Sequence, residues 1–115
     1  MVFGSGTIGI AAAVAFRHFG MDRVMVCDRS DFRLKLAEKL GFAVCNPSAE
    51  DLGAKAAAYF GTAPSLSGSA ANIDCWLDAA GAERILEDFL RLGKIESRFV
   101  SVAVNNKPRN IDLLH

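Results

Sequence analysis

The sequence lacks the charge imbalance that would attract a charged partner. Its 115 residues include 13 lysines and arginines and 13 aspartates and glutamates, so the formal net charge is zero. Without a net field, we expect no binding to nucleic acid, to an anionic membrane or to an acidic protein. An anionic ligand would have to be held by local geometry.

Cysteine and histidine are also scarce. The three cysteines, Cys27, Cys45 and Cys75, are widely spaced and form no C-x-x-C pair, and His18 and His115 are isolated. This spacing does not match a zinc site, so we expect no metal to be bound by this chain. We expect the cysteines to be buried free thiols in a reducing cytosol.

The sequence has no apolar run long enough to cross a bilayer. Residues 1–16 carry no charge, but Arg17 ends the run, and the basic leader of a signal peptide is missing. We therefore expect a cytoplasmic protein with no membrane contact. The length and the hydrophobic content of 51% predict a single compact domain over residues 1–115.

Short β-rich runs alternate with helical runs that end near a glycine, which is the pattern of an α/β fold. We expect strands at 1–3, 23–27, 42–45, 73–77 and 98–104, and helices at 7–19, 30–40, 48–60 and 82–92. Phe32, Leu36 and Leu40 share one face of the second helix, and Ser48 and Asp51 have the spacing of a capping box. The small and polar residues 61–72 predict a flexible surface loop.

One motif carries chemistry. Gly4-Ser5-Gly6-Thr7-Ile8-Gly9 follows the first strand and opens the first helix, and Asp28 ends the second strand about 20 residues further on. Together these features form the fingerprint of a dinucleotide-binding Rossmann fold. They predict an α/β, doubly wound parallel sheet of five to six strands in the order 3-2-1-4-5-6, with helices on both faces.

Each glycine of the motif has a physical role. Gly4 permits the tight turn, Gly6 lets the backbone approach a pyrophosphate, and Gly9 lets the helix pack closely on the sheet. The free N–H groups near Thr7 and Ile8 would face the pyrophosphate at the positive end of the helix dipole. The alternative is a glycine-rich turn in an α/β fold that has lost its ligand.

Asp28 can accept hydrogen bonds from the adenosine ribose and would repel the extra phosphate of NADP, so NAD is favoured. NADP is the less favoured alternative, because Arg29 and Arg33 are close by and arginine accommodates a 2′-phosphate. The ends of strands four and five should border the nicotinamide, at Ala79, Ala80, Val102, Ala103 and Val104. For Asp78 a capping role and a ligand role both remain open.

Two stretches resemble a known family. VFGSGTIGIAAAVAFRHFGMDRVMVCDRSDFRLKLAEKLGFAVCNPSAEDL and IDCWLDAAGAERILEDFLRLGKIESRFVSVAV are similar to the cofactor domain of the medium-chain, zinc-type alcohol, polyol and threonine dehydrogenases. The resemblance implies pyrophosphate contacts at Gly6, Thr7 and Ile8, and ribose contacts at Asp28 and Arg33. It also implies that Ala79–Ala80 and Val102–Val104 line the nicotinamide. The sequence departs from the family at Ala103 and at residues 94–97, where glycines are usual.

The resemblance implies hydride transfer between NAD and an alcohol carbon coordinated to zinc in the parent protein. The zinc ligands would lie in a catalytic domain that is absent here, so we expect this chain to be an inactive fragment whose partner is that domain. A homodimer through residues 111–114 is a further hypothesis. Two alternatives stay open: a nucleotide-sensing module of the type that gates potassium channels, and a methyltransferase that uses S-adenosylmethionine.

Overall fold

The computed structural model describes residues 1–65 and 68–103. Five strands form one sheet: β1 (Val2–Phe3), β2 (Met25–Cys27), β3 (Ala43–Cys45), β6 (Cys75–Asp78) and β7 (Arg98–Ser101). Two more, β4 (Thr62–Ser65) and β5 (Gly68–Ala71), pair with each other. The helices are α1 (Thr7–His18), α2 (Asp31–Lys39), α3 (Leu52–Phe60) and α4 (Glu83–Leu92).

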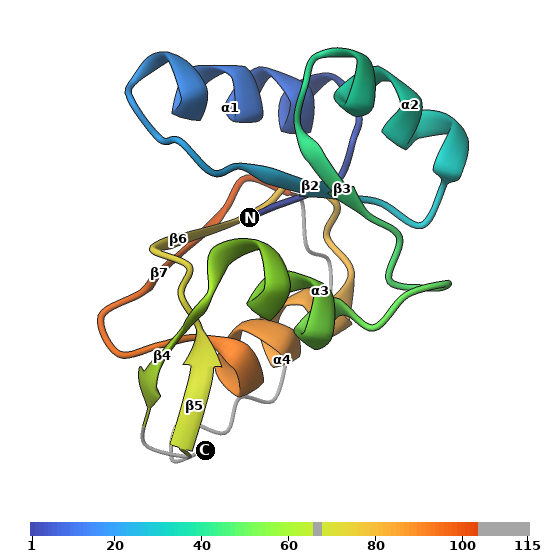
Figure 1. Ribbon diagram of the computed structural model, residues 1–115. Coiled ribbons are helices and arrows are strands. Elements are labelled where there is room, and N and C mark those ends of the chain that lie inside the picture. Colours follow the sequence, from blue (N-terminus) through green and yellow to red (C-terminus); the bar gives the residue numbers. More distant parts are fainter. Residues whose placement is uncertain (66–67, 104–115) are drawn as a thin grey trace.

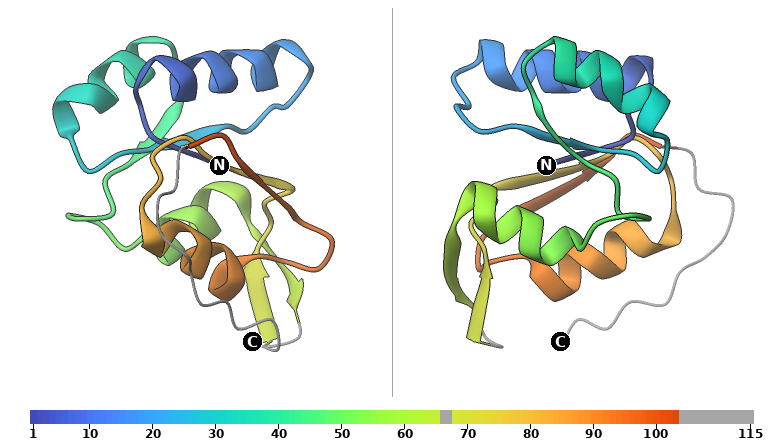
Figure 2. Two further views of the ribbon diagram at one scale, coloured as in Figure 1. Left: turned by 180° about the vertical axis from the view of Figure 1, so that it is seen from behind. Right: turned by 45° about the vertical axis from the view of Figure 1, so that its right-hand side comes forward.

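The five-stranded sheet has the order β3-β2-β1-β6-β7, and all its neighbouring strands are parallel. This matches the predicted 3-2-1-4-5 order once β4 and β5 are set aside. Helices α1 and α2 cover one face of the sheet, and α3 and α4 cover the other (Figures 1 and 2). The predicted Rossmann-type fold is confirmed, whereas the sixth strand and the dimer segment 111–114 lie outside the described residues.

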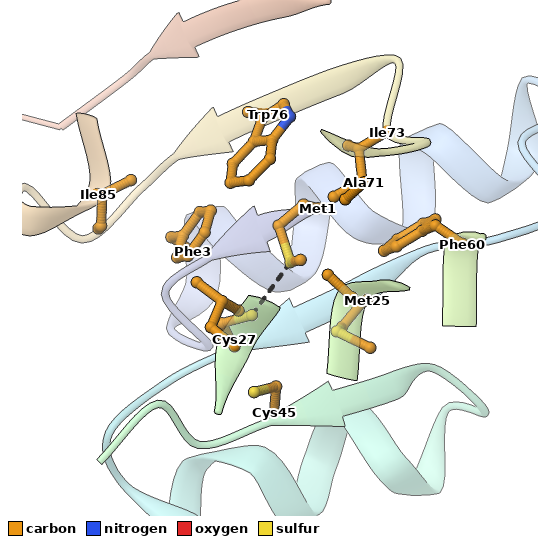
Figure 3. Packing of buried hydrophobic residues seen from close by; sticks show 12 residues of the cluster. Met1, Phe3, Met25, Cys27, Cys45, Phe60, Ala71, Ile73, Trp76 and Ile85 are labelled. Carbon is orange, nitrogen blue, oxygen red and sulfur yellow. Dashed lines mark hydrogen bonds between the residues drawn. The ribbon is translucent and has the colours of Figure 1, made fainter. Parts of the chain in front are cut away.

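Side-chain alternation along the strands divides the core into two clusters. Val2 belongs to the cluster under α1 and α2, while Met1 and Phe3 belong to the cluster on the α3 and α4 side. Trp76 is fully buried in the second cluster and stacks on Phe3 with ring centroids 5.8 Å apart (Figure 3). This packing on both faces holds the strand ends of the sheet, where ligands of this fold bind, in a fixed arrangement.

The segment 61–72, which the sequence predicts as a flexible surface loop, contains two strands. Strands β4 and β5 form an antiparallel hairpin, with Thr62 opposite Ala71 and Ser65 opposite Gly68. Ala70 and Ala71 are buried, and Ala71 packs in the same cluster as Trp76. Tertiary packing therefore orders a segment whose composition alone has little strand propensity.

The face shared by Phe32, Leu36 and Leu40 is not the buried face of α2. Phe32 is 81% exposed and Leu36 is 51% exposed, whereas Leu34 and Ala37 are buried against the sheet. Helical periodicity identifies apolar faces, but it does not say which of two such faces meets the sheet. The face that these three residues share therefore lies toward solvent.

The predicted capping box before α3 is also wrong. Helix α3 begins at Leu52 after Asp51, and the Asp51 side chain makes no capping hydrogen bond. Ser48 instead belongs to a turn in which its backbone N–H donates to Asn46 Oδ1 over 3.0 Å. In the second helix the predicted cap is present, because the Arg33 N–H donates to Ser30 Oγ.

Candidate functional site

The glycine turn between β1 and α1 has the geometry that the motif predicts. Gly4 has a φ of +105°, which favours glycine, and its N–H donates to the Cys27 carbonyl over 2.7 Å. A Cβ added at Gly9 would lie 1.7 Å from the Gly4 carbonyl oxygen, so the helix can pack on the turn only without a side chain there. A Cβ at Gly6 would meet nothing within 4 Å and would project into open space. That space is where the motif predicts a phosphate.

The start of α1 leaves donors unused by the helix. Gly6 occupies the N-cap position without a side-chain capping bond, and no acidic residue lies in the first turn. The first bond of the helix runs from the Ile10 N–H to the Gly6 carbonyl, at 3.0 Å. The N–H groups of Thr7 and Ile8 precede that bond, and such groups with the helix dipole form an anion site.

The carboxylate of Asp28 is held in place by backbone donors on both sides. Oδ2 accepts the Ser5 N–H at 2.8 Å, and Oδ1 accepts the Ser30 N–H at 2.9 Å. Ser5 Oγ in turn donates to the Arg33 carbonyl at 2.8 Å, which ties the glycine turn to α2. Each ionised oxygen has further acceptor capacity, so Asp28 could still accept the hydroxyl groups of a ribose.

Asn46 fixes the loop that follows β2, and sequence reasoning missed this role. This buried side chain donates through Nδ2 to the Arg29 carbonyl at 3.2 Å and to Asp31 Oδ1 at 2.9 Å. Its position directly before Pro47 indicated only a turn. The contact with a loop 17 residues earlier in the chain is a tertiary feature that local spacing does not reveal.

The glycine turn and the strand ends open onto a pocket of about 310 Å³. The predicted site residues that line it are Gly4, Gly6, Asp28, Arg29, Arg33, Ala79 and Ala80. It is also lined by residues that the sequence reasoning missed, among them Pro47 from the loop before α3 and Arg84, Ile85 and Asp88 from α4. Ile85 and Asp88 are three residues apart on one face of α4, a spacing that could have pointed to them.

The other predicted site residues lie outside this pocket. Ile8 is 60% exposed at the start of α1, and Gly9 is buried beneath the turn. Thr7 borders a separate groove between α1 and α2. Val102 and Ala103 follow β7, where the Val102 N–H donates to the Asp78 carbonyl at 3.0 Å. Val104 lies outside the described residues.

Asp78 shapes the turn that follows β6. Its buried Oδ1 accepts the N–H groups of Ala80 at 2.9 Å and Gly81 at 2.8 Å, and so fixes the pocket wall at residues 79–81. Its Oδ2 is buried and has no hydrogen-bond partner within the described part of the chain. The sequence left both a capping role and a ligand role open for Asp78. The contacts of its side chain in the structure are those of a cap on this turn.

The buried thiol of Cys27 forms part of the pocket wall. Cys27 and Cys45 are opposite each other on β2 and β3, and the Cys27 thiol lies 3.1 Å from Met1 Sδ (Figure 3). Hydrogen bonding to Cys45 together with burial raises the pKa of Cys27 well above its ordinary value, so the thiol stays neutral. Within residues 1–65 and 68–103, no three His, Cys, Asp or Glu side chains gather as a metal site would require.

Within the described ranges 1–65 and 68–103, no helix has the length and apolar character that a bilayer crossing needs.

Comparison with known proteins identifies similar domains. A family model described as "Zinc-binding dehydrogenase" matches residues 7–115. L-threonine 3-dehydrogenase from Anaeromyxobacter dehalogenans is 31% identical over 113 residues, which is 97% of this chain and 30% of that protein. The chain therefore spans less than a third of the length of this relative.

Solved structures show the same fold. A short chain alcohol dehydrogenase from E. coli CFT073, complexed with NADH, matches with a TM-score of 0.77 and 26% identity, over 96% of this chain and 31% of that one. A zinc-binding dehydrogenase from Sinorhizobium meliloti bound to NADP matches with a TM-score of 0.72 and 23% identity, over 96% and 31% of the two chains.

Proposed function

Since the chain belongs to the zinc-binding dehydrogenase family, we propose that it is the NAD-binding domain of a dehydrogenase that transfers hydride between NAD and an alcohol or polyol. The observation that carries this proposal is the glycine turn beside Asp28. Open space at Gly6, unused N–H groups at the start of α1 and a fixed carboxylate together suit a pyrophosphate followed by a ribose.

The position of Asp28 supports NAD rather than NADP. Both carboxylate oxygens are held by backbone N–H groups, so the negative charge cannot turn away from a 2′-phosphate without breaking two hydrogen bonds. Arg29 and Arg33 line the same pocket and would favour that phosphate. NADP is therefore the less favoured cofactor, and the related structures with NADH and with NADP are consistent with either dinucleotide.

The chemistry of the reaction would belong to the larger protein. A catalytic zinc takes three protein ligands, and the part of the chain that the structure describes offers no such group. The proposed zinc would therefore be held by residues of a separate catalytic domain, which would also select the substrate.

We propose that the 115-residue chain alone has no dehydrogenase activity, that its parent is cytoplasmic, and that residues 111–114 mediate a homodimer. Turnover of an alcohol by the purified chain would contradict the first point, and a monomer in sedimentation at high concentration would contradict the last.

Calorimetric titration of the chain with NAD, NADP and S-adenosylmethionine tests the cofactor assignment. We expect NAD to bind, and Asp28→Ala to weaken NAD roughly tenfold or more while shifting the preference toward NADP, because a charged hydrogen-bond acceptor is lost. Asp22→Ala is the matched control, since this aspartate is exposed and does not line the pocket. The proposal would be contradicted if the unsubstituted chain bound NADP more tightly than NAD, or bound S-adenosylmethionine in place of NAD.

A further inference from the structure

A carboxylate lies on the buried side of α4, where an apolar side chain would be expected. The buried residues of this helix are Ile85 and Asp88, and Asp88 is only 7% exposed. Aspartate is almost never buried unless it is paired, because removing its charge from water is costly. The position of Asp88 therefore calls for a physical account.

Two arginines of the same helix contact Asp88, and both use the same oxygen. Arg91 donates to Oδ1 at 3.1 Å, and Arg84 Nε lies 3.9 Å from that oxygen. Both arginine side chains are at least half exposed, so these ion pairs contribute little stability. Oδ2 is engaged by neither arginine.

Asp88 lines the same 310 Å³ pocket as Asp28. Phe3, Pro47 and Ile85 supply apolar walls to this pocket, and Arg84, whose side chain is largely exposed, also lines it. Apolar walls suit the flat faces of a purine, and a carboxylate suits the polar edge of a purine that carries an amine. Asp28 is bonded to the glycine turn through Ser5, so it is placed to serve the ribose next to the phosphates. Asp88 lies on a different element, α4, and is therefore available to bind the base.

We propose that Asp88 determines base specificity by accepting a hydrogen bond from the exocyclic amine of the cofactor's adenine. This inference rests on the proposed function, because it assumes that a dinucleotide occupies the pocket. A base with an oxygen in place of that amine, such as hypoxanthine, would bring two acceptors together, and Asp88 would lose the donor that the amine provides. The pocket would thus select adenine and not merely a purine.

The test compares NAD with nicotinamide hypoxanthine dinucleotide by calorimetric titration of the 115-residue chain. If the amine donates to the charged Asp88, the unsubstituted chain should bind NAD roughly 10-fold or more tightly than the hypoxanthine analogue. Asp88→Asn carries both an acceptor and a donor, and its amide can donate to the hypoxanthine oxygen. The preference in this variant should therefore fall to about threefold or less.

Glu87→Gln is the matched control, because it removes one negative charge from the exposed side of the same helix and should leave the preference unchanged. Equal affinities of the unsubstituted chain for the two dinucleotides would overturn the inference, and so would an unchanged preference in Asp88→Asn. If the variant fails to fold, the comparison of the two dinucleotides on the unsubstituted chain still tests whether the pocket prefers adenine. If neither dinucleotide binds the unsubstituted chain, the proposed function fails as well. If both bind with equal affinity, only the role of Asp88 is contradicted.

Discussion

The two glycines of the turn should respond differently to the same substitution. In Gly9→Ala the new methyl group would lie 1.7 Å from the Gly4 carbonyl oxygen and 2.8 Å from the Gly4 carbonyl carbon. The contacting atoms are backbone and cannot rotate away, so α1 must move from the turn. Overpacking of this kind costs about 3 kcal/mol, at the upper end of the usual range.

In Gly6→Ala the methyl group meets no atom within 4 Å, and the φ of −83° is open to alanine. Only the weaker N-cap propensity of alanine remains, which costs about 1 kcal/mol or less. The same methyl group would occupy the space proposed for the pyrophosphate. Gly6→Ala should therefore keep the fold and lose at least tenfold in NAD affinity.

Denaturant unfolding followed by the fluorescence of Trp76, the single tryptophan, measures both variants, because this residue is fully buried. We expect Gly9→Ala to lower the free energy of unfolding by about 3 kcal/mol, equivalent to roughly 12 °C in melting temperature. A loss below about 0.5 kcal/mol would refute the close packing of α1 on the turn. NAD affinity unchanged in Gly6→Ala would refute the phosphate assignment.

Three further predictions follow from single features of the structure. Burial lowers the pKa of the Met1 amino group from 8.0 to about 6, so the unfolded chain takes up a proton below pH 8 that the folded chain accepts only near pH 6. The free energy of unfolding should therefore fall by about 2 kcal/mol between pH 8 and pH 6 in denaturant titrations, and N-terminal acetylation should abolish this dependence. With a thiol-specific reagent, the half-buried Cys75 should react in the folded chain, whereas Cys27 and Cys45 should react only after unfolding; equal rates for all three would contradict their burial. Glu96 has a φ of +66°, so Glu96→Gly should raise the free energy of unfolding by about 0.5 kcal/mol, while Glu87→Gly within α4 should lower it by about 1 kcal/mol; thermal melts that give both variants the same sign would contradict this.

The sequence was sufficient for the sheet order and for the glycine turn, because both depend on local patterns. The strand, turn and helix around Gly4 and Gly9 form one continuous segment, and the parallel arrangement follows from the alternation of strands and helices. Asp28 was identifiable for the same reason, since it ends the next strand at the spacing that the fold requires.

The remaining features depend on contacts between distant segments. The pairing of β4 with β5 accompanies the burial of Ala70 and Ala71, which composition does not predict. The exposed Phe32 and buried Leu34 are equally apolar, and only the sheet decides which faces inward. The spacing of Ile85 and Asp88 indicates that they share one face of α4, but only the packing of α4 in the fold places that face in the same pocket as Asp28.

The central claim is that a dinucleotide binds at the glycine turn and the adjoining strand ends. An NMR titration of the isotope-labelled chain with NAD tests it most directly, because each backbone N–H reports its own surroundings. We expect the largest shifts at Ser5, Gly6, Thr7, Asp28 and Ala80, and little change in the hairpin of β4 and β5. Shifts confined to the hairpin or to α3, or none at saturating NAD, would contradict the account.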